Sequence, residues 1–290
     1  MKPMRPALRT SFHALRTALV VLALAAPAWA QQRPLVTEDP ETIGAGRVLI
    51  EGGIDGAKDM TYTVSGLKGN LWRVPTIGIS VGVSSIAEVQ IDGGHDLLSI
   101  TDRDLGAPLA NLVTATGDST HDWEDTYVGM KIRLVPEAAG RPALGIRFAT
   151  KLPNASNESG LGTDTMDFYG SLLGAKTVQS VRVVANVGFG IMSDPTNGNR
   201  QNDVLTYGGS FARAVTQQTE VVGEVNGRVS VRSGEPFPGT ETRGILKLGG
   251  RYTVGAWRVD AGVYFGLTPI DPTIGFTTGF TYVFNAFTLP

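Results

Sequence analysis

The sequence has no cysteine and only three histidines in 290 residues. The absence of cysteine excludes disulfide scaffolds, thiolate zinc sites, iron–sulfur clusters and cysteine nucleophiles. Three histidines leave little material for a metal site built on imidazoles. Charged residues are also scarce, at 18% against the usual quarter. We therefore expect neither a metal nor another cofactor.

Long apolar runs are missing as well. No segment after the first thirty residues approaches the 18 consecutive apolar residues of a transmembrane helix. If the chain meets a membrane, it must do so as a β-barrel or on the membrane surface. Glycine, in contrast, is abundant, with 37 residues. No Gly-X-Y period accompanies it, which excludes a collagen helix.

The first thirty residues have the pattern of a secretory signal peptide. A short apolar stretch, Thr17–Ala26, precedes the small-residue site Ala28-Trp29-Ala30 and follows four basic residues, Lys2, Arg5, Arg9 and Arg16. An uncleaved membrane anchor is the alternative, but ten apolar residues are too short to span a bilayer. Cleavage would leave 21 basic against 27 acidic residues, a net charge of about −6. An acidic exported chain is not expected to bind nucleic acid.

Strict alternation of apolar and polar residues dominates the remaining sequence. In 181–191 the odd positions are Val, Val, Ala, Val, Phe and Ile, whereas the even positions are mostly small or polar. This period of two is typical of a β-strand with two different faces. The alternation predicts twelve strands, at 47–56, 70–83, 86–99, 124–134, 142–152, 165–176, 181–192, 203–214, 218–231, 241–253, 256–267 and 275–284.

The connections between these strands alternate in length. Short turns follow every second strand, whereas long polar segments, such as 57–69 and 100–123, follow the others. Outer-membrane barrels have short periplasmic turns, long external loops and an even number of strands. The sequence therefore predicts an all-β fold: a transmembrane antiparallel up-and-down barrel of about twelve strands, without helices, in the bacterial outer membrane. We divide the chain into a signal peptide (1–30), an N-terminal periplasmic arm (31–46) and the barrel (47–290).

Within most strands the charged residues occupy either odd or even positions, that is, one face of the strand. We assign this face to the lumen. The residues expected to line the lumen, and with it the solute path, are Glu51, Lys131, Arg133, Arg147, Arg182, Glu224, Arg228, Arg243, Lys247, Arg251, Arg258 and Asp260. Residues of the other parity are expected to face lipid: Val183, Val187, Phe189, Val225, Leu248, Val259 and Val263. A soluble sandwich or lipocalin-like barrel would also alternate, but it would place its charges outside.

Several short motifs resemble a bacterial outer-membrane transporter family, the one named for the meta-pathway of phenol degradation. The motifs span nearly all of the chain after residue 30: Pro34–Pro40 with Thr42, Gly44 and Gly46; Gly82–Val89; Asp125–Leu134; Leu152-Pro153; Gly162-Thr163-Asp164; Asp167-Phe168; and Tyr282-Val283-Phe284. Two features depart from the family pattern. Glu38 replaces the more usual aspartate, and residues 285–290 extend beyond the terminal aromatic residue.

The resemblance implies passive uptake of small aromatic or other hydrophobic compounds, and it implies no particular binding residues. The expected partners are therefore a small-molecule solute, the lipid bilayer with its lipopolysaccharide, and the outer-membrane assembly machinery. Five basic and three acidic residues of lumen parity, among them Glu220, Arg251 and Arg258, lie between residues 220 and 260. Such a basic stripe could favour anions, for example a carboxylated aromatic. The alternative is that these charges neutralise one another across strands.

Two other functions remain open. The chain could be a lipid-modifying enzyme, with His95 or His121 beside a serine such as Ser99 or Ser119, although no Gly-x-Ser-x-Gly elbow occurs. It could also be a structural or adhesive barrel that transports nothing. Carboxylates near the two histidines could hold a hard cation, but a solvated run of loop charges is the favoured interpretation. We expect a channel, not an enzyme.

Overall fold

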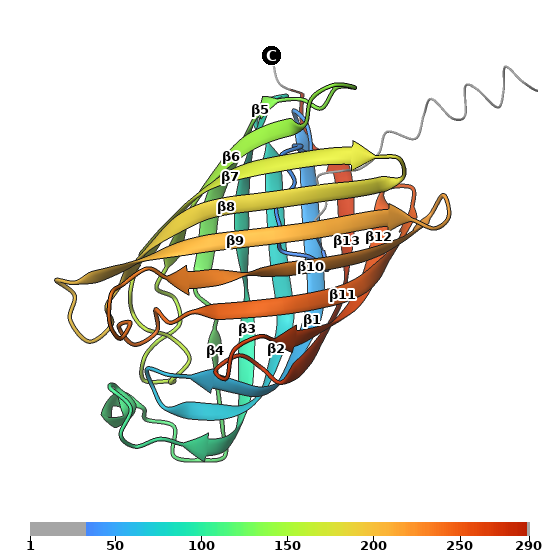
Figure 1. The fold of residues 1–290 in the computed structure, drawn as a ribbon. Helices are drawn as coiled ribbons and strands as arrows, with labels where there is room; N and C mark the ends of the chain where they lie inside the picture. The colour runs from blue at the N-terminus through green and yellow to red at the C-terminus, as the bar shows by residue number, and fades with distance from the viewer. Residues whose placement is uncertain (1–32, 289–290) are drawn as a thin grey trace, which may run out of the picture.

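A computed structural model describes residues 33–288, so the expected signal peptide lies outside the described residues. These residues form a closed antiparallel barrel (Figure 1). The strands are β1 (Arg47–Tyr62), β2 (Leu67–Gly82), β3 (Ala87–Arg103), β4 (Ser119–Trp123), β5 (Thr126–Val135), β6 (Ala143–Leu152), β7 (Asp167–Val178), β8 (Val181–Ser193), β9 (Gln201–Ala214), β10 (Thr219–Ser230), β11 (Arg243–Val254), β12 (Trp257–Gly266) and β13 (Ile274–Asn285).

These elements make twelve barrel strands, because β4 and β5 are two pieces of one strand. Both pair with β3, β4 along His95–Ser99 and β5 along Ala87–Asp92. Every other strand pairs with its neighbours in sequence, and β13 pairs with β1 from Arg47↔Asn285 to Lys58↔Ile274. That last pairing closes the ring and leaves no exposed sheet edge, which a lipid bilayer would not tolerate. The expected fold class is confirmed.

Two expected long loops are shorter than the sequence indicated. The segment 57–69 is mostly strand, and β1 and β2 are joined by a hairpin of residues 63–66. Part of the segment 100–123 forms β4 as well as the tail of β3. The periodic signal is lost there because β1 changes register between Ala57 and Met60, where Asp59 has a φ of 59°. Such a bulge reverses the side-chain parity in the remainder of the strand.

A second bulge lies in β2. The pairing of β2 with β3 shifts between Arg73 and Thr76. As a result, Leu71 and Arg73 face the interior on one side of the shift, whereas Thr76 and Gly78 do so on the other. Inward residues in this strand therefore change from odd to even numbers, a switch that simple alternation does not reveal.

The outer surface of the barrel is apolar. Its large exposed side chains include Leu172 (62%), Val187 (50%), Phe189 (49%), Leu248 (46%) and Val259 (51%). In a barrel that spans a membrane this surface contacts lipid, and the usual arrangement of a soluble core is inverted. Trp72, Trp123, Tyr252 and Trp257 are likewise exposed, whereas Tyr62 faces a cavity inside the external mouth.

Helical structure is minimal within residues 33–288. A single turn of 3-10 helix, η1 (Ala110–Leu112), lies in the connection between β3 and β4. No helix in this part of the chain is long enough and apolar enough to cross a membrane.

Candidate solute path through the barrel

The N-terminal segment 33–46 lies inside the barrel. We expected a periplasmic arm here, but its hydrogen bonds place it within the lumen. The backbone N–H groups of Val36 and Thr37 donate to the carboxylate of Glu224 at 2.9–3.0 Å, and the Thr37 hydroxyl donates to it at 2.8 Å. Glu38 exchanges two backbone hydrogen bonds with the amide of Asn186, at 2.7 and 2.8 Å. We call residues 33–46 the arm.

Ion pairs fix the acidic residues of the arm to the barrel wall. Lys131 is fully buried, and its Nζ lies 3.2 Å from Glu38 and 3.1 Å from Glu88. Arg147 Nε lies 3.1 Å from the other oxygen of Glu38. Arg182 forms a bidentate pair with Asp39, at 2.6 and 2.8 Å. Buried charges cost free energy unless they are paired and hydrogen-bonded, so this wall is built to hold an acidic segment.

The start of the arm is held by β2, β11 and β13. Arg33 donates to Thr76 Oγ1 of β2 at 3.0 Å and to the Thr278 carbonyl of β13 at 2.9 Å. Lys247 donates to the Pro34 carbonyl at 2.7 Å, and Arg251 Nε donates to the Arg33 carbonyl at 2.7 Å. The arm therefore crosses the lumen from β13 and β2 to β5 and β8.

Inward glycines make room for the arm. A methyl group added at Gly208 of β9 would lie 3.6 Å from Thr37 Cβ, and one at Gly145 of β6 would lie 3.2 Å from Pro40 Cβ. Larger clashes would arise at Gly53 and Gly279, where the added carbon would meet the guanidinium of Arg33 at 2.3–2.7 Å. These inward-facing glycines leave the space that the arm occupies, which we call its seat.

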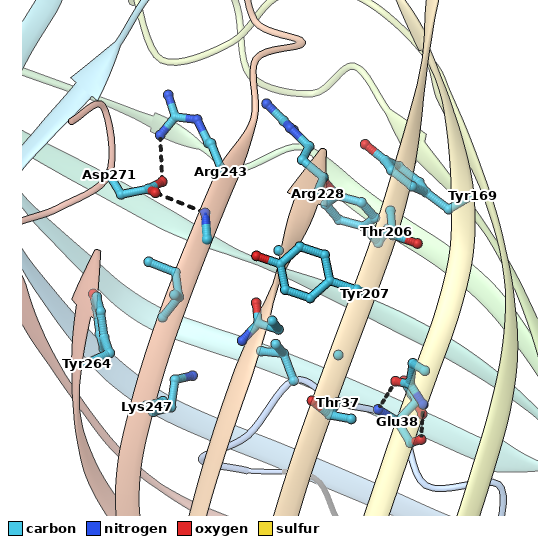
Figure 2. A pocket seen from close by; sticks show the side chains of 18 of the residues that line it. Thr37, Glu38, Tyr169, Thr206, Tyr207, Arg228, Arg243, Lys247, Tyr264 and Asp271 are labelled. Atoms are coloured by element: carbon cyan, nitrogen blue, oxygen red, sulfur yellow. Dashed lines mark hydrogen bonds and ion pairs between the residues drawn. The ribbon is translucent and has the colours of Figure 1, made fainter. Parts of the chain in front are cut away.

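A chamber of about 570 Å³ lies in the lumen on the external side of the arm. Val36 and Glu38 of the arm contribute to its floor, and its wall is lined by residues of most strands (Figure 2). The lining includes the tyrosines Tyr127, Tyr169, Tyr207 and Tyr264, the basic residues Arg73, Arg147, Arg228, Arg243 and Lys247, the acidic residues Glu38, Asp55 and Asp271, and the apolar residues Ala57, Met60, Leu71, Leu173 and Ile245. The chamber therefore offers apolar surface together with charged groups, of which five are basic and three are acidic.

The chamber continues toward the external loops. A second cavity, of about 280 Å³, shares Met60, Tyr127, Tyr169, Arg228 and Arg243 with it. Residues 160–163 and 238–239 of two external loops line the far side of this second cavity. These loops pack over the mouth, where the Ser65 hydroxyl donates to the Gly160 carbonyl at 2.7 Å. The external entrance is narrowed by loops.

A smaller cavity, of about 190 Å³, lies on the periplasmic side of the arm. It is lined by Leu35, Thr37 and Asp39 of the arm together with Arg182, Arg251, Arg258 and Glu220 of the wall. An extended segment presents alternate residues to opposite sides, so the arm faces the outer chamber with Val36 and Glu38 and the inner cavity with its odd residues. The two spaces share a single lining residue, Thr37. A further cavity, of about 470 Å³, lies beside the arm and shares Leu35 with the inner cavity and Val36 and Glu38 with the outer chamber.

The structure brings most of the expected lumen residues together around the arm. Lys131, Arg133, Arg147, Arg182, Glu224, Lys247 and Arg251 contact it directly, and Asp260 lies 3.5 Å from Arg33 Nε. Glu51 accepts a hydrogen bond from Thr281 at 3.0 Å, and Arg258 lies 3.6 Å from Glu220. Arg228 and Arg243 stand apart from the arm and line the outer chamber.

The inward tyrosines were not among the residues expected to line the path. Their parity could have revealed them, because Tyr264 is the register partner of Lys247 and Tyr127 is the partner of Lys151. Tyr127 and Tyr169 lie together, with ring centroids 6.0 Å apart. The contribution of the arm could not be found from the strand pattern, because the arm is not a strand.

The two histidines lie on the outer face. His95 alternates with Ile91 and Leu97, both more than 40% exposed, and neither histidine lines the outer chamber, the second cavity or the inner cavity. Its ring centroid lies 5.4 Å from that of His121 and 5.3 Å from that of Trp123. Asp92 and Asp96 have the opposite parity, so strand geometry separates them from His95. No group of three or more metal-ligating side chains occurs in residues 33–288.

A closed barrel with an apolar outer face and a polar, partly filled lumen is a transmembrane β-barrel of the kind found in bacterial outer membranes. The fold is similar to the crystal structure of the COG4313 outer membrane channel from Pseudomonas putida F1, with a TM-score of 0.60, 12% identity, and coverage of 85% of this chain and 98% of that one.

The NanC porin is also similar, with a TM-score of 0.51, 6% identity, and coverage of 81% and 98%. At these identities the likeness shows a shared fold. No family model matches the sequence, and no curated protein matches it.

Proposed function

We propose that the protein is a passive outer-membrane channel for small solutes that combine an apolar, often aromatic, portion with a polar group. The observation that carries this proposal is the chain of cavities inside a closed barrel, about 280 and 570 Å³ on the external side and about 190 Å³ on the periplasmic side. Ligand cavities of several hundred cubic ångströms accommodate small organic molecules. A purely structural barrel has no need of such a lined interior.

The composition of the outer chamber supports this solute class. Four tyrosines and several aliphatic residues line it beside arginines, and aromatic rings pack well on such mixed surfaces. The likeness to a solved structure described as an outer membrane channel agrees with this proposal. So does the motif resemblance to the transporter family named for phenol degradation, the finer assignment that we propose for the chain. Insertion by the outer-membrane assembly machinery and contact with lipopolysaccharide belong to the same proposal.

The position of the arm inside the lumen determines how such a channel would open. Because the arm lies between the outer chamber and the inner cavity, we propose that a solute passes when the arm leaves its seat. Polar contacts, many of them to charged groups, hold the arm, and several of them must break together before it moves, because buried charge pairs are costly to separate. The channel would therefore open in brief events, not as a permanently wide pore.

Single-channel recording in planar bilayers tests this function. We expect small, flickering conductance from the chain that begins at Gln31, and a conductance several-fold larger from a chain without residues 33–43. Correct folding of both is checked by heat-modifiable gel migration. Silence from both folded proteins would contradict the channel and favour a structural barrel. Lipid hydrolysis lost on replacing His95 or His121 would instead support an enzyme.

A further inference from the structure

Two arginines face each other on neighbouring strands at the external end of the chamber. Arg228 of β10 and Arg243 of β11 are direct register partners. Both line the outer chamber and the cavity above it (Figure 2). Like charges directly opposite one another on a sheet are destabilising, so this pair needs a compensating interaction.

The other charged register partners on these strands are of opposite sign. Glu224 pairs with Lys247, and Arg251 pairs with both Glu220 and Asp260. Cross-strand neutralisation therefore accounts for the middle and the periplasmic end of the basic stripe. It does not account for the external end, where two cations are partners.

Nearby protein groups compensate this pair only in part. Arg228 donates to the backbone carbonyls of Glu241 and Gly239, at 2.9 and 2.7 Å. No carboxylate within residues 33–288 lies within 4.0 Å of it. Arg243 donates to the backbone carbonyls of Ile270 and Thr61, at 3.0 and 2.9 Å, and the only carboxylate within 4.0 Å of it in residues 33–288 is that of Asp271, at 3.7 Å. That carboxylate already accepts hydrogen bonds from the Gly244 N–H at 2.9 Å and from the Thr268 hydroxyl at 2.7 Å. The pair retains an excess of positive charge, and within the described residues Arg228 Nη1 and Arg243 Nε have no hydrogen-bond partner.

A further donor lies beside the arginines. Asn226 precedes Arg228 by two residues on the same face of β10, and its buried Nδ2 has no hydrogen-bond partner within the described chain. A buried amide without a partner costs free energy. An anionic oxygen that enters here would therefore meet N–H donors of the two guanidinium groups and of the Asn226 amide.

Other walls of the same chamber are apolar. Ala57 and Leu71 belong to a hydrophobic cluster inside the barrel, against which Met60 and Tyr264 pack. These four residues line the outer chamber together with the two arginines. The chamber thus combines a cationic site with a hydrocarbon surface, which suits a small molecule with one charged end.

We propose that Arg228 and Arg243 form an anion-binding subsite that receives the carboxylate of a small aromatic acid, while its ring lies against the apolar wall of Ala57, Met60, Leu71 and Tyr264. The guanidinium N–H groups that remain without a partner can form charge-assisted hydrogen bonds with a carboxylate. This inference rests on the proposed channel function and names the solute class for that path.

Benzoate and its neutral analogue benzamide are the probes. Their affinities for the detergent-solubilised protein are measured by calorimetry. We expect benzoate to bind about tenfold more tightly than benzamide, the lower end of what a charge-assisted hydrogen bond contributes. The substitution Arg228→Gln should weaken benzoate about tenfold and leave benzamide unchanged, whereas Arg228→Lys should retain part of the preference. Arg213→Gln, at an exposed arginine of β9 that does not line the outer chamber, is the matched control for net charge and should have no effect.

Equal affinities of the wild-type protein for benzoate and benzamide would overturn the subsite. So would an unchanged benzoate affinity in folded Arg228→Gln. If Arg228→Gln does not fold, the subsite is tested by the ratio of the benzoate and benzamide affinities of the wild-type protein and by the same ratio in Arg228→Lys. Conductance without a benzoate preference would remove the subsite but leave the channel. A benzoate preference in a silent protein would retain the subsite and remove the channel.

Discussion

A disulfide that fastens the arm to the wall should close the channel. The pair Thr37→Cys and Gly208→Cys suits this purpose, because a Cβ at Gly208 would lie 3.6 Å from Thr37 Cβ. Disulfides have Cβ–Cβ distances of roughly 3.5–4.5 Å. The chain has no cysteine of its own, so no competing bridge can form. Thr37 also lines both the outer chamber and the inner cavity, and the bridge would fix the arm at that point.

The structure indicates the size of the effect. Replacing Thr37 removes the 2.8 Å hydrogen bond from its hydroxyl to Glu224. A hydrogen bond to a charged group contributes about 1.5–3 kcal/mol, and about 1.4 kcal/mol corresponds to a tenfold change in population. The reduced double variant should therefore open about tenfold more often than the wild type, whereas the oxidised variant should remain closed.

Single-channel recording before and after addition of a reductant measures the difference. The single variants Thr37→Cys and Gly208→Cys are the controls, and their currents should not respond to reductant. Formation of the bridge is verified by thiol titration on the same sample. Equal currents from the bridged and the reduced protein would refute the reasoning, because solutes would then pass beside a stationary arm.

Three further predictions concern the arm, the lipid face and the external loops. Glu224→Gln should raise the open probability about tenfold, since the carboxylate that accepts the arm's hydrogen bonds loses its charge; an unchanged open probability would contradict the proposed anchoring. Leu172→Arg, at the middle of β7 on the lipid face, should destabilise the barrel by about 2–4 kcal/mol in denaturant unfolding in lipid, and a cost near zero would place this face away from hydrocarbon. For Asp194 of an external loop, burial opposes ionisation, but hydrogen bonds from Thr196 and the charge of Arg200 prevail and lower the pKa. Because that pKa is lower in the folded state, its contribution to stability is present above the usual aspartate pKa and is lost as pH falls through the folded value. Asp194→Asn should consequently lower the melting temperature at neutral pH and lose this effect in acid; a pH-independent loss would contradict the assignment.

Much of the fold was predictable because alternate residues of each strand face two different environments, the lipid and the lumen. From β5 to β13 the expected limits agree with the observed strands to within a few residues. The prediction weakened from β1 to β4, where bulges near Asp59 and Pro75 change the parity of the strand. Bulges depend on local backbone geometry and on the partner strand, neither of which a periodic pattern contains.

The candidate site was less accessible from sequence. Parity identified charged residues such as Lys131 and Arg182 but not what they contact, because their partners lie in an arm without periodicity. Opposed arginines at 228 and 243 follow from the register of β10 and β11. A hairpin register is set by the turn and bulges together, and the long segment 231–242 gives no such guide. The outer chamber and the inner cavity could be located only once the course of the arm through the lumen was known.

The seam between β1 and β13 lies directly beside the point where the arm leaves the wall. The N–H groups of Ala286 and Phe287, beyond the last strand, both donate to the Gly46 carbonyl, at 2.9 and 3.1 Å, at the junction of arm and β1. The residues after the terminal aromatic thus tie the end of the chain to the base of the arm. Because the ring closes where the arm enters it, the pairing of β1 with β13 also fixes the base of the arm at the rim of the lumen. A weakened seam would therefore loosen the barrel wall and the attachment of the arm together.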